Sequence, residues 1–465
     1  IIILNRNFEG SIMKILFYTL GFPPYRSGGL TKYSFDLSNG LSKLGHEIYI
    51  LWPGEINRFK KFGINTKQET NTGIFNCEII NPLPVALDEG IRDISLFMNP
   101  CDLEVCICFL EKLKPEIFHI HTLMGLHKEW IIAAKKLGIK IIYTTHDYYG
   151  LCPKVTLYRN GNICSSLYDC SECTECNETA LSIEKITMLQ SPLYRKVKDL
   201  YVIKWLRKIH RNNYFSEMES ERVKLEKNDD RKEDYVVIQK YYKWILENVD
   251  FIHYNSTITK NIFEKCLQAP KGQVISISNE SVRDMRVRMF YNTCSKLKLT
   301  YLGPLKSYKG FQFIVSVLDE LWNQGHTGFE LNIYTGTSLK RPYINYKKSG
   351  YKTEDLDTIF ANTDILLVPS QWYETFGLTT IEALSYAVPV IISDTVGAKD
   401  LVRYDYGWIL KRNKEEWQLL IKEIIYNRDL ITDKNERIYN SDELAKYLNY
   451  KNHLLEIKGV YEERV

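Results

Sequence analysis

Short runs of apolar residues alternate with stretches of helical periodicity along most of this chain. The run KILFYTL, which begins at Lys14, is typical of a strand buried on both faces of a parallel sheet. Residues 31–44 then repeat apolar side chains at helical spacing, and Gly45 ends this helix before the strand EIYIL. This order predicts one strand–helix–strand unit of a parallel α/β sheet. Further strands of the same sheet are predicted at CEII, IFHIH, KIIYTT, FIHYN and VISIS.

A second series of the same kind follows the polar stretch at 279–296. Its predicted strands are LKLTYLG, FELNIYTG, DILLVPS and VPVIIS, with helical periodicity between them. We therefore expect an α/β protein with two doubly wound domains, at 13–278 and 297–440. A helical segment at 441–465 follows, for which packing back on the first domain is one arrangement. Because ligands of such sheets bind outside the carboxyl ends of the strands, the loops after strands are the places to look for chemistry.

Two stretches of the first predicted domain do not follow this alternation. One is a cysteine-rich loop at 151–176, and the other is a charged, helical insertion at 193–245. The loop ends in a C-x2-C-x2-C pattern, which in a reduced compartment favours a structural Zn2+ held by thiolates over disulfides. Unpaired cysteines in a loop are the alternative. The candidate metal ligands are Cys152, Cys164, Cys170, Cys173 and Cys176.

Composition and charge narrow the class of protein. Apolar residues make up 45% of the 465 residues and charged residues 25%, as in a globular protein. The net charge of +4 is too small to indicate a nucleic-acid partner, and 11 cysteines are too few for a disulfide scaffold. No uninterrupted apolar run reaches the roughly 18 residues that a membrane-spanning helix needs. We expect a cytoplasmic protein, with the residues before Met13 forming an extension outside the fold.

The most informative stretch reads PSQWYETFGLTTIEALSYAVPVIISD, from Pro369 to Asp394. It begins at the carboxyl end of a predicted strand and opens a helix near Gly377, whose free amide groups favour a phosphate. Glu374 lies in the loop and Glu382 eight positions further on in the helix. Carboxylates accept hydrogen bonds from hydroxyl groups, which suits a sugar or a ribose.

The whole phrase resembles the E-x7-E signature of the retaining family 4 glycosyltransferases. Other motifs occur in that family's order: the Gly28-Gly29 loop, GHE, HIH, TTHD, YLG followed by KG, and SDTVG. The resemblance covers about three-quarters of the chain from Met13. It implies the GT-B fold, in which two Rossmann-like domains face each other across a cleft, and transfer of a sugar from a UDP- or GDP-sugar without a metal or other cofactor.

The resemblance also implies roles for individual residues. Glu382 matches the glutamate that holds the nucleotide ribose, Glu374 the one beside the donor-sugar hydroxyls, and Lys309 the lysine that meets the diphosphate. His146 matches the histidine that reaches toward the reacting carbon. The remaining donor-site residues match the glycine loop that closes on the donor and the helix start over the phosphates, and they are Gly28, Gly29, Phe376, Gly377, Leu378 and Thr379.

One position departs from the family's pattern. The family usually carries an arginine after the strand-end glycine, whereas here Gly303 is followed by Pro304. Lys309 alone cannot make the bidentate contact of an arginine to a diphosphate. Lys306 is near enough in the sequence to replace the missing cation.

Four other residues have weaker support as functional candidates. Asp355 and Asp357 spell D-x-D, but their apolar neighbours indicate one face of a helix rather than a metal site. His119 and His121 lie on a strand that is buried on both faces, so a structural role is as good an interpretation as substrate contact.

The expected function is retaining transfer of a sugar to a saccharide or lipid-linked saccharide in surface polysaccharide biosynthesis. A basic, amphipathic helix is predicted from Arg195 to Arg211, where seven residues are Lys or Arg. Such a helix either lies on an anionic membrane, at the inner face of the cell membrane, or packs on its domain. The rival functions are a nucleotide-sugar 2-epimerase of the same fold and a non-catalytic nucleotide-sugar-binding homologue.

Overall fold

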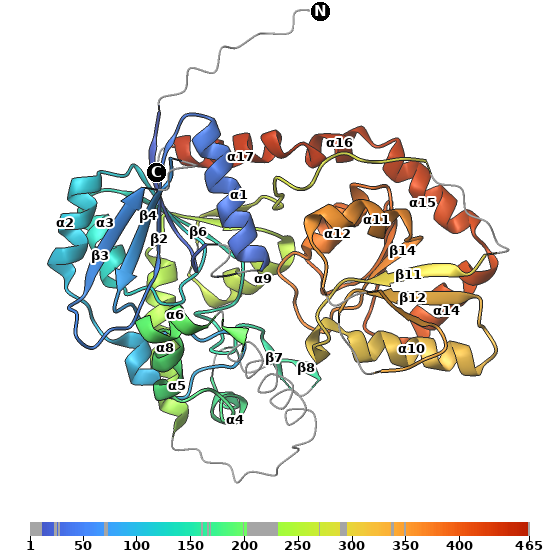
Figure 1. Ribbon diagram of the computed structural model, residues 1–465, viewed down its shortest axis with the longest axis horizontal. Helices are drawn as coiled ribbons and strands as arrows, with labels where there is room; N and C mark the ends of the chain where they lie inside the picture. Colours follow the sequence, from blue (N-terminus) through green and yellow to red (C-terminus); the bar gives the residue numbers. More distant parts are fainter. Residues whose placement is uncertain are drawn as a thin grey trace, which may run out of the picture. The chain divides into compact units, whose positions relative to one another are not determined.

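The computed structural model of the chain contains two large sheets flanked by helices (Figure 1). It describes residues 12–463 except 23–25, 27, 69–72, 160, 165–166, 168, 199, 202–230, 269, 289–294, 336–338 and 348–349. Most of the predicted basic helix, from residue 202 onward, therefore lies outside the described residues.

The first sheet has eight strands in the order β10-β9-β6-β5-β1-β2-β4-β3. Neighbouring strands run parallel in the pairs recorded, except that β3 is antiparallel to β4. The strands are β1 (Lys14–Tyr18), β2 (Glu47–Pro53), β3 (Gly63–Gln68), β4 (Phe75–Ile80), β5 (Ile117–Ile120), β6 (Lys140–Thr144), β9 (Phe251–Tyr254) and β10 (Gly272–Val274). The helices of this part are α1 (Gly29–Lys43), α2 (Leu103–Leu113), α3 (Glu129–Lys136), α4 (Cys173–Cys176), α5 (Ile183–Leu189), α6 (Pro192–Val197), α8 (Lys232–Glu247) and α9 (Thr257–Cys266).

The predicted strands of this sheet are confirmed, except that one of them lies at a different position in the sequence. The strand predicted at VISIS is wrong in its position, because β10 ends at Val274, where that prediction begins. Ile275 and Ile277 are buried without strand pairing, so their apolar pattern reflects burial. The pattern also missed β3, most of whose side chains are exposed, and the short hairpin of β7 (Tyr158–Arg159) and β8 (Asn162–Ile163).

The second sheet has six parallel strands in the order β13-β12-β11-β14-β15-β16. Figure 1 shows α10 and α14 on one face of it and α11 and α12 on the other. The strands are β11 (Leu297–Tyr301), β12 (Phe329–Ile333), β13 (Ile344–Tyr346), β14 (Ile365–Val368), β15 (Val390–Ser393) and β16 (Gly407–Leu410). The helices are α10 (Phe311–Asn323), α11 (Leu356–Ala361), α12 (Leu378–Leu384), α13 (Lys399–Val402), α14 (Lys414–Tyr426), α15 (Asp429–Tyr439), α16 (Asp442–Leu448) and α17 (Tyr450–Glu462).

Side chains at helical spacing on α10 build the core of the second sheet. Ile314, Leu318 and Leu321 are fully or almost fully buried and pack in one cluster with β11, β12 and Trp417 of α14. Burying such side chains contributes roughly 1.5–3 kcal/mol each, so the amphipathic stripe fixes the helix on the sheet. This rigid base holds the loops that follow β11 and β14.

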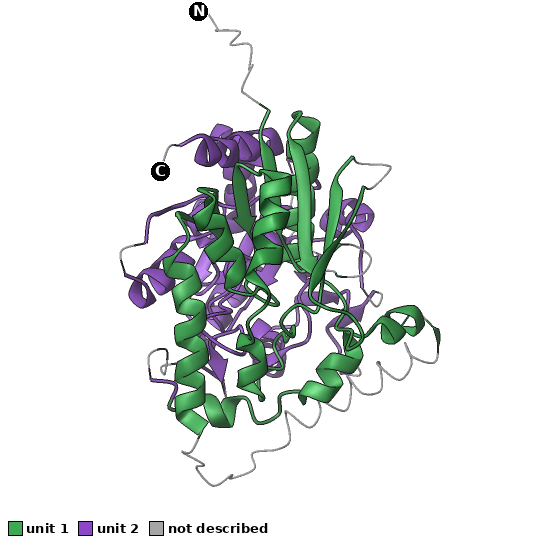
Figure 2. Ribbon diagram, turned by 90° about the vertical axis from the view of Figure 1, so that its left-hand side faces the viewer, with its two compact units in different colours: residues 1–144, 171–251, 465 green, residues 145–170, 252–464 purple. Residues whose placement is uncertain are grey.

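The chain forms two compact units, and each unit consists of segments that are separated in the sequence (Figure 2). Residues 1–144, 171–251 and 465 form the first unit, and residues 145–170 and 252–464 form the second. The predicted domain bounds remain a prediction. Gly28 and Gly29 belong to the first unit. His146, Lys306 and all predicted donor-site residues that follow Lys306 in the sequence belong to the second unit.

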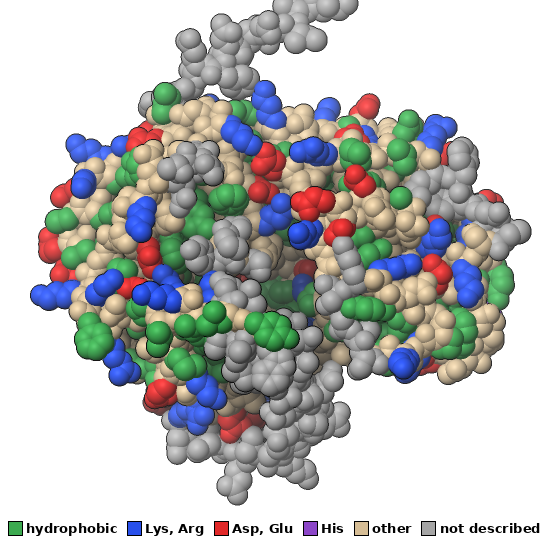
Figure 3. All heavy atoms as spheres, in the orientation of Figure 1, with side chains coloured by type: hydrophobic (Ala, Val, Ile, Leu, Met, Phe, Trp, Pro, Cys, Tyr) green, Lys and Arg blue, Asp and Glu red, His purple; other side chains and the backbone are tan. Residues whose placement is uncertain are grey.

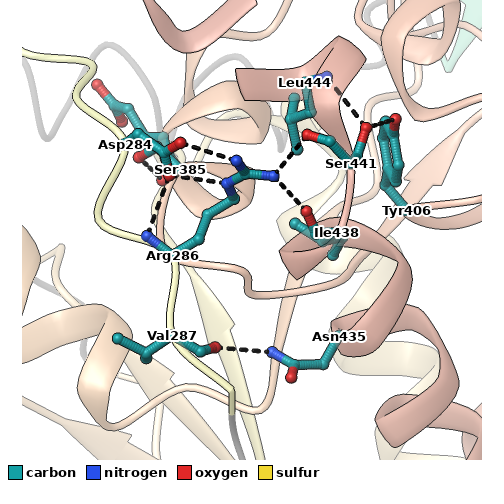
Figure 4. A network of polar contacts seen from close by, with 10 residues as sticks. Asp284, Arg286, Val287, Ser385, Tyr406, Asn435, Ile438, Ser441 and Leu444 are labelled. Atoms are coloured by element: carbon teal, nitrogen blue, oxygen red, sulfur yellow. Dashed lines mark hydrogen bonds and ion pairs between the residues drawn. The ribbon is translucent and has the colours of Figure 1, made fainter. Parts of the chain in front are cut away.

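The described part of the predicted linker is held by hydrogen bonds within the second unit (Figure 4). The guanidinium of Arg286, whose side chain is only 9% exposed, pairs with Asp284 and donates to the carbonyls of Ile438 and Ser441. Asn435 of α15 donates to the Val287 carbonyl. Residues 284–287 are therefore anchored on the helices after the second sheet rather than extended freely.

The visible surface carries both signs of charge. Figure 3 shows Lys and Arg side chains interspersed with Asp and Glu side chains over the face in view. This distribution agrees with the small net charge of +4.

Candidate active site

The loop from Pro369 to Gly377 connects β14 to α12 and carries the first motif glutamate. Gly377 adopts φ 98°, ψ 69°, which strains any residue with a side chain. A Cβ at this position would lie 2.9 Å from Cγ1 of Val396. The backbone of Glu374 is held on both sides, because its N–H donates to the Thr395 carbonyl and its carbonyl accepts from Gly397 N–H. The loop therefore has a fixed conformation before α12 begins at Leu378.

The Glu374 carboxylate forms an ion pair with Lys309. Lys309 Nζ donates to Oε1 at 2.7 Å, and the hydroxyl of Ser370 donates to Oε2. The two charged side chains are 21% and 13% exposed, so the pair is only partly screened by solvent. Lys309 Nζ also lies 4.9 Å from the centroid of the Trp372 ring, a cation–π arrangement. The structure thus brings together Lys309 and Glu374, which stand 65 positions apart in the chain.

A close approach of two loops produces this pair. Gly310 adopts φ 79°, and a Cβ there would come within 1.8 Å of the Pro369 carbonyl oxygen. Next to this contact, the backbone N–H of Gln371 donates to the Tyr308 carbonyl at 2.8 Å. Only glycine allows the loop after β11 to pass so near the loop after β14.

Pro304 and Lys306 occupy the same loop as Lys309. The Tyr301 hydroxyl donates to the Pro304 carbonyl at 2.7 Å and fixes the turn where the family's arginine would stand. Lys306 Nζ lies 5.5 Å from the centroid of the Tyr308 ring. Whether Lys306 takes over the arginine's contact to a diphosphate remains a prediction.

His146 is half-buried and belongs to the same unit as this loop. Its carbonyl accepts a hydrogen bond from the Thr375 hydroxyl at 3.1 Å, which ties it to the glutamate loop. The pKa of His146 is lowered to about 3, mainly by desolvation and to a lesser extent by the neighbouring His253 and His453. The imidazole is therefore neutral at physiological pH.

Glu382 and the helix start complete the predicted donor residues. Glu382 is half-buried on α12, and its charge adds to burial in raising the pKa of Tyr351. Phe376 is buried, and its carbonyl accepts from Ala398 N–H at 2.7 Å. Leu378 and Thr379 are half-buried at the first turn of α12.

Two aromatic residues near Glu374 were missed by sequence reasoning. Tyr148 is fully buried, and its pKa is raised well above its usual value by burial first, then by Tyr373 and Glu374. Its ring meets that of Trp372 edge-on, with centroids 6.3 Å apart. In the described part of the chain, neither the Tyr148 hydroxyl nor the Trp372 indole N–H has a hydrogen-bond partner. Tyr148 stands two residues after His146, and Trp372 stands two residues before Glu374. These positions were the only signals in the sequence that could have indicated the two aromatic residues.

The other sequence candidates are placed as follows. His119 is fully buried and hydrogen-bonds through Nε2 with the Thr144 hydroxyl at 2.7 Å, so its structural interpretation is confirmed. Asp357 lies on α11 and accepts from the Tyr386 hydroxyl. Gly28, with φ 127°, immediately precedes α1.

The five loop cysteines are divided between the two units. Cys173 and Cys176 begin and end α4 of the first unit, and the other three lie between residues 152 and 170 of the second. The family match described next gives no support to a zinc ion in this loop.

Comparison with known proteins identifies the family. The profile of "Glycosyl transferases group 1" matches residues 294–443, and that of "Glycosyltransferase Family 4" matches residues 27–167. One mostly parallel and one fully parallel α/β sheet, together with these two matches, define a GT-B glycosyltransferase. The chain belongs to the family 4 glycosyltransferases of group 1, enzymes that are generally retaining hexosyltransferases and generally work without a metal. The predicted family and fold class are confirmed.

Individual relatives agree with this assignment. A protein of Klebsiella pneumoniae described as an "uncharacterized 42.6 kDa protein in cps region" is 24% identical over 83% of this chain and 86% of its own length. Among solved structures, Anabaena Alr3699/HepE in complex with UDP and glucose is similar with a TM-score of 0.56 and 12% identity, over 96% of this chain and 99% of that one. WaaG, a glycosyltransferase involved in lipopolysaccharide biosynthesis, is similar with a TM-score of 0.50 and 11% identity, over 95% and 99%.

Proposed function

We propose that this enzyme transfers a hexose from a nucleotide-sugar, with retention of configuration, to a saccharide or lipid-linked saccharide during surface polysaccharide biosynthesis. The observation that carries the proposal is the ion pair of Lys309 and Glu374, held beside the glycine turn at Gly377. The Klebsiella relative's place in a cps region and the similarity to WaaG support a surface polysaccharide as the product.

In this proposal, donor binding replaces the ion pair: Lys309 and Glu374 each contact the donor instead of each other. The diphosphate accepts from Lys309 Nζ and from amide groups between Phe376 and Thr379, and Glu374 turns to the sugar hydroxyls. Glu382 holds the ribose. The positive charge of Lys309 then offsets the charge that develops on the departing diphosphate.

The same arrangement supports a front-face reaction. The acceptor hydroxyl attacks the anomeric carbon on the side from which the diphosphate leaves, and a phosphate oxygen takes its proton. His146, neutral because its pKa is about 3, contributes hydrogen bonding and position rather than charge. Tyr148 and Trp372 offer a buried hydroxyl and an indole N–H near Glu374.

A donor screen tests the proposal. UDP-glucose is the first candidate because HepE was solved with UDP-glucose, and GDP-hexoses are the second set. A true donor raises the thermal midpoint, since it binds the folded state alone. The Lys309→Ala variant should lose this shift, while Lys422→Ala on α14 serves as a matched control. A chain that is stabilised by no nucleotide-sugar would refute the proposal.

Product analysis separates the two rival functions. A nucleotide-sugar 2-epimerase would convert the donor without an acceptor, and a non-catalytic homologue would bind the donor without releasing nucleotide. Transfer requires nucleotide release that depends on an added acceptor.

Membrane association is the second part of the proposal. Among the described helices, none is both long and apolar enough to cross a bilayer. We expect a peripheral position on the inner face of the cell membrane through the basic stretch 195–211, at about 1 kcal/mol for each Lys or Arg near an anionic surface. Co-sedimentation with anionic vesicles should be lost at high salt and after Lys204, Arg207, Lys208 and Arg211 are changed to Gln. Binding to neutral vesicles of equal strength would contradict it.

A further inference from the structure

A cluster of metal-ligating side chains lies in the first unit, outside the residues assigned to sugar transfer. One ligand atom from each of Cys101, His127 and Glu129 lies within 4.8 Å of the other two. Cys106 extends the cluster, because its Sγ is 3.7 Å from Sγ of Cys101. Three of these four residues are buried, and Cys101 is half-buried.

The spacing of the two sulfur atoms fits shared coordination better than a disulfide. Two thiolates bound at about 2.3 Å to one tetrahedral zinc ion stand about 3.8 Å apart. A disulfide would need roughly 2.05 Å. The observed 3.7 Å is close to the first value. The carboxylate of Glu129 adds a further ligand, with Oε2 3.9 Å from the Cys101 sulfur.

Glu129 provides the strongest reason to expect a cation. Its side chain is 6% exposed, and within the described residues its hydrogen-bond partner is the Cys101 thiol, with no Lys or Arg forming an ion pair. A buried carboxylate without a cation is costly, whereas a metal ion would neutralise it together with a thiolate.

Both ring nitrogens of His127 face backbone carbonyls. Nδ1 lies 2.9 Å from the Asn99 carbonyl, and Nε2 lies 3.4 Å from the Asn81 carbonyl. A ligating histidine commonly donates one ring N–H to a carbonyl, so metal binding requires the other ring nitrogen of His127 to give up its carbonyl contact.

The backbone holds these ligands in place. Cys101 and Cys106 flank the start of α2, where Asp102 caps the helix, and His127 and Glu129 stand at the start of α3. The two helices pack together. We propose that Cys101, Cys106, His127 and Glu129 form a structural site for one Zn2+ that fastens the beginnings of α2 and α3. Thiolate, imidazole and carboxylate ligands together favour zinc over the hard cations Mg2+ and Ca2+.

The test uses the full-length chain, purified without chelator and under reducing conditions. Elemental analysis should show that Cys101→Ser and Glu129→Gln each lose about one Zn2+ per chain relative to the wild type. Zinc titration should show that the affinity of each variant for Zn2+ falls by more than the roughly 10–100-fold expected when a residue hydrogen-bonded to a metal ligand is changed. Cys108→Ser is the matched control, since Cys108 is exposed on the same helix. Cys173→Ser distinguishes this site from any zinc in the cysteine-rich loop.

A second readout does not depend on the stability of the variants. Co2+ added to metal-free wild type should give thiolate charge-transfer absorption and the visible bands of a tetrahedral ion. Zn2+ should also protect Cys101 and Cys106, but not Cys108, from alkylation. Wild-type protein that binds neither ion, or zinc content unchanged by Cys101→Ser, would each overturn the proposal.

Discussion

Three histidines with lowered pKa values should make the stability of this enzyme strongly dependent on pH. His146, His253 and His453 all belong to the second unit, and burial is the main cause that lowers their pKa values to about 3, 4 and 3. Their rings are near each other, with the centroids of His253 and His453 6.4 Å apart. We expect the folded protein to lose stability as the pH falls from 8 to 5.

The sign and size follow from proton binding. In the unfolded chain a histidine with pKa near 6.5 takes up a proton below that pH, whereas the folded protein keeps these three neutral until its own lower pKa values are reached. Acid therefore favours the unfolded state. Each histidine contributes about 2 kcal/mol of lost stability at pH 5 relative to pH 8, and the three together about 6 kcal/mol. This is comparable to the entire stability of many domains.

Urea unfolding at pH 8, 7, 6 and 5 measures this loss. The His453→Gln variant should reduce the difference between pH 8 and pH 5 by about 2 kcal/mol. Leu454→Ala on the same helix removes a buried side chain but no titrating group, so it should lower stability by about 2–5 kcal/mol at every pH and leave the pH dependence unchanged. Burial raises the pKa of Glu456, so this carboxyl acts in the opposite sense and only at the acid end. Equal stability at pH 8 and 5, or a full wild-type dependence in His453→Gln, would refute the reasoning.

Three further predictions concern the proposed donor site. Glu382→Ala should weaken nucleotide binding and Glu374→Ala should lower kcat more than nucleotide affinity, each by about ten- to a hundredfold, and equal small effects on both quantities would contradict the assigned roles. Lys306→Ala should lower kcat/KM about as much as Lys309→Ala if it replaces the family's arginine; steady-state kinetics on both variants would show a negligible effect if it does not. Gly310→Ala should abolish transfer or folding because its Cβ would collide with the Pro369 carbonyl, whereas Gly325→Ala at an open position with φ 87° should cost only backbone strain, as circular dichroism and activity can verify.

The sequence was sufficient to predict the two sheets and the family, because buried parallel strands appear as continuous apolar runs. It also indicated Glu374 and Lys309 as candidate donor-site residues, since both lie in motifs at the ends of strands. It did not predict that they pair, because the approach of Gly310 to Pro369 depends on the packing of β11 beside β14. Tyr148 was not predicted as a site residue, because an aromatic residue after a strand is ordinarily part of the core.

The cluster at Cys101 shows another limit of sequence reasoning. Cys101 and Cys106 have a spacing that matches no common metal motif, and His127 and Glu129 follow more than twenty residues later. Only the packing of α2 on α3 brings them together. The cysteine-rich loop has the more conspicuous pattern, because its cysteines are close together in the sequence.

The composition of the second unit determines how the enzyme can be divided experimentally. That unit contains residues 145–170 and 252–278 in addition to everything after the linker. Ser256 donates to the Thr375 carbonyl at 2.7 Å, and Thr257 donates to Asp400. A chimaera joined at the linker would therefore pair a donor site from one parent with supporting residues from another. Exchanges of donor specificity between relatives should carry these two early segments along with the carboxyl-terminal half, so that the hydrogen bonds behind the glutamate loop come from a single parent.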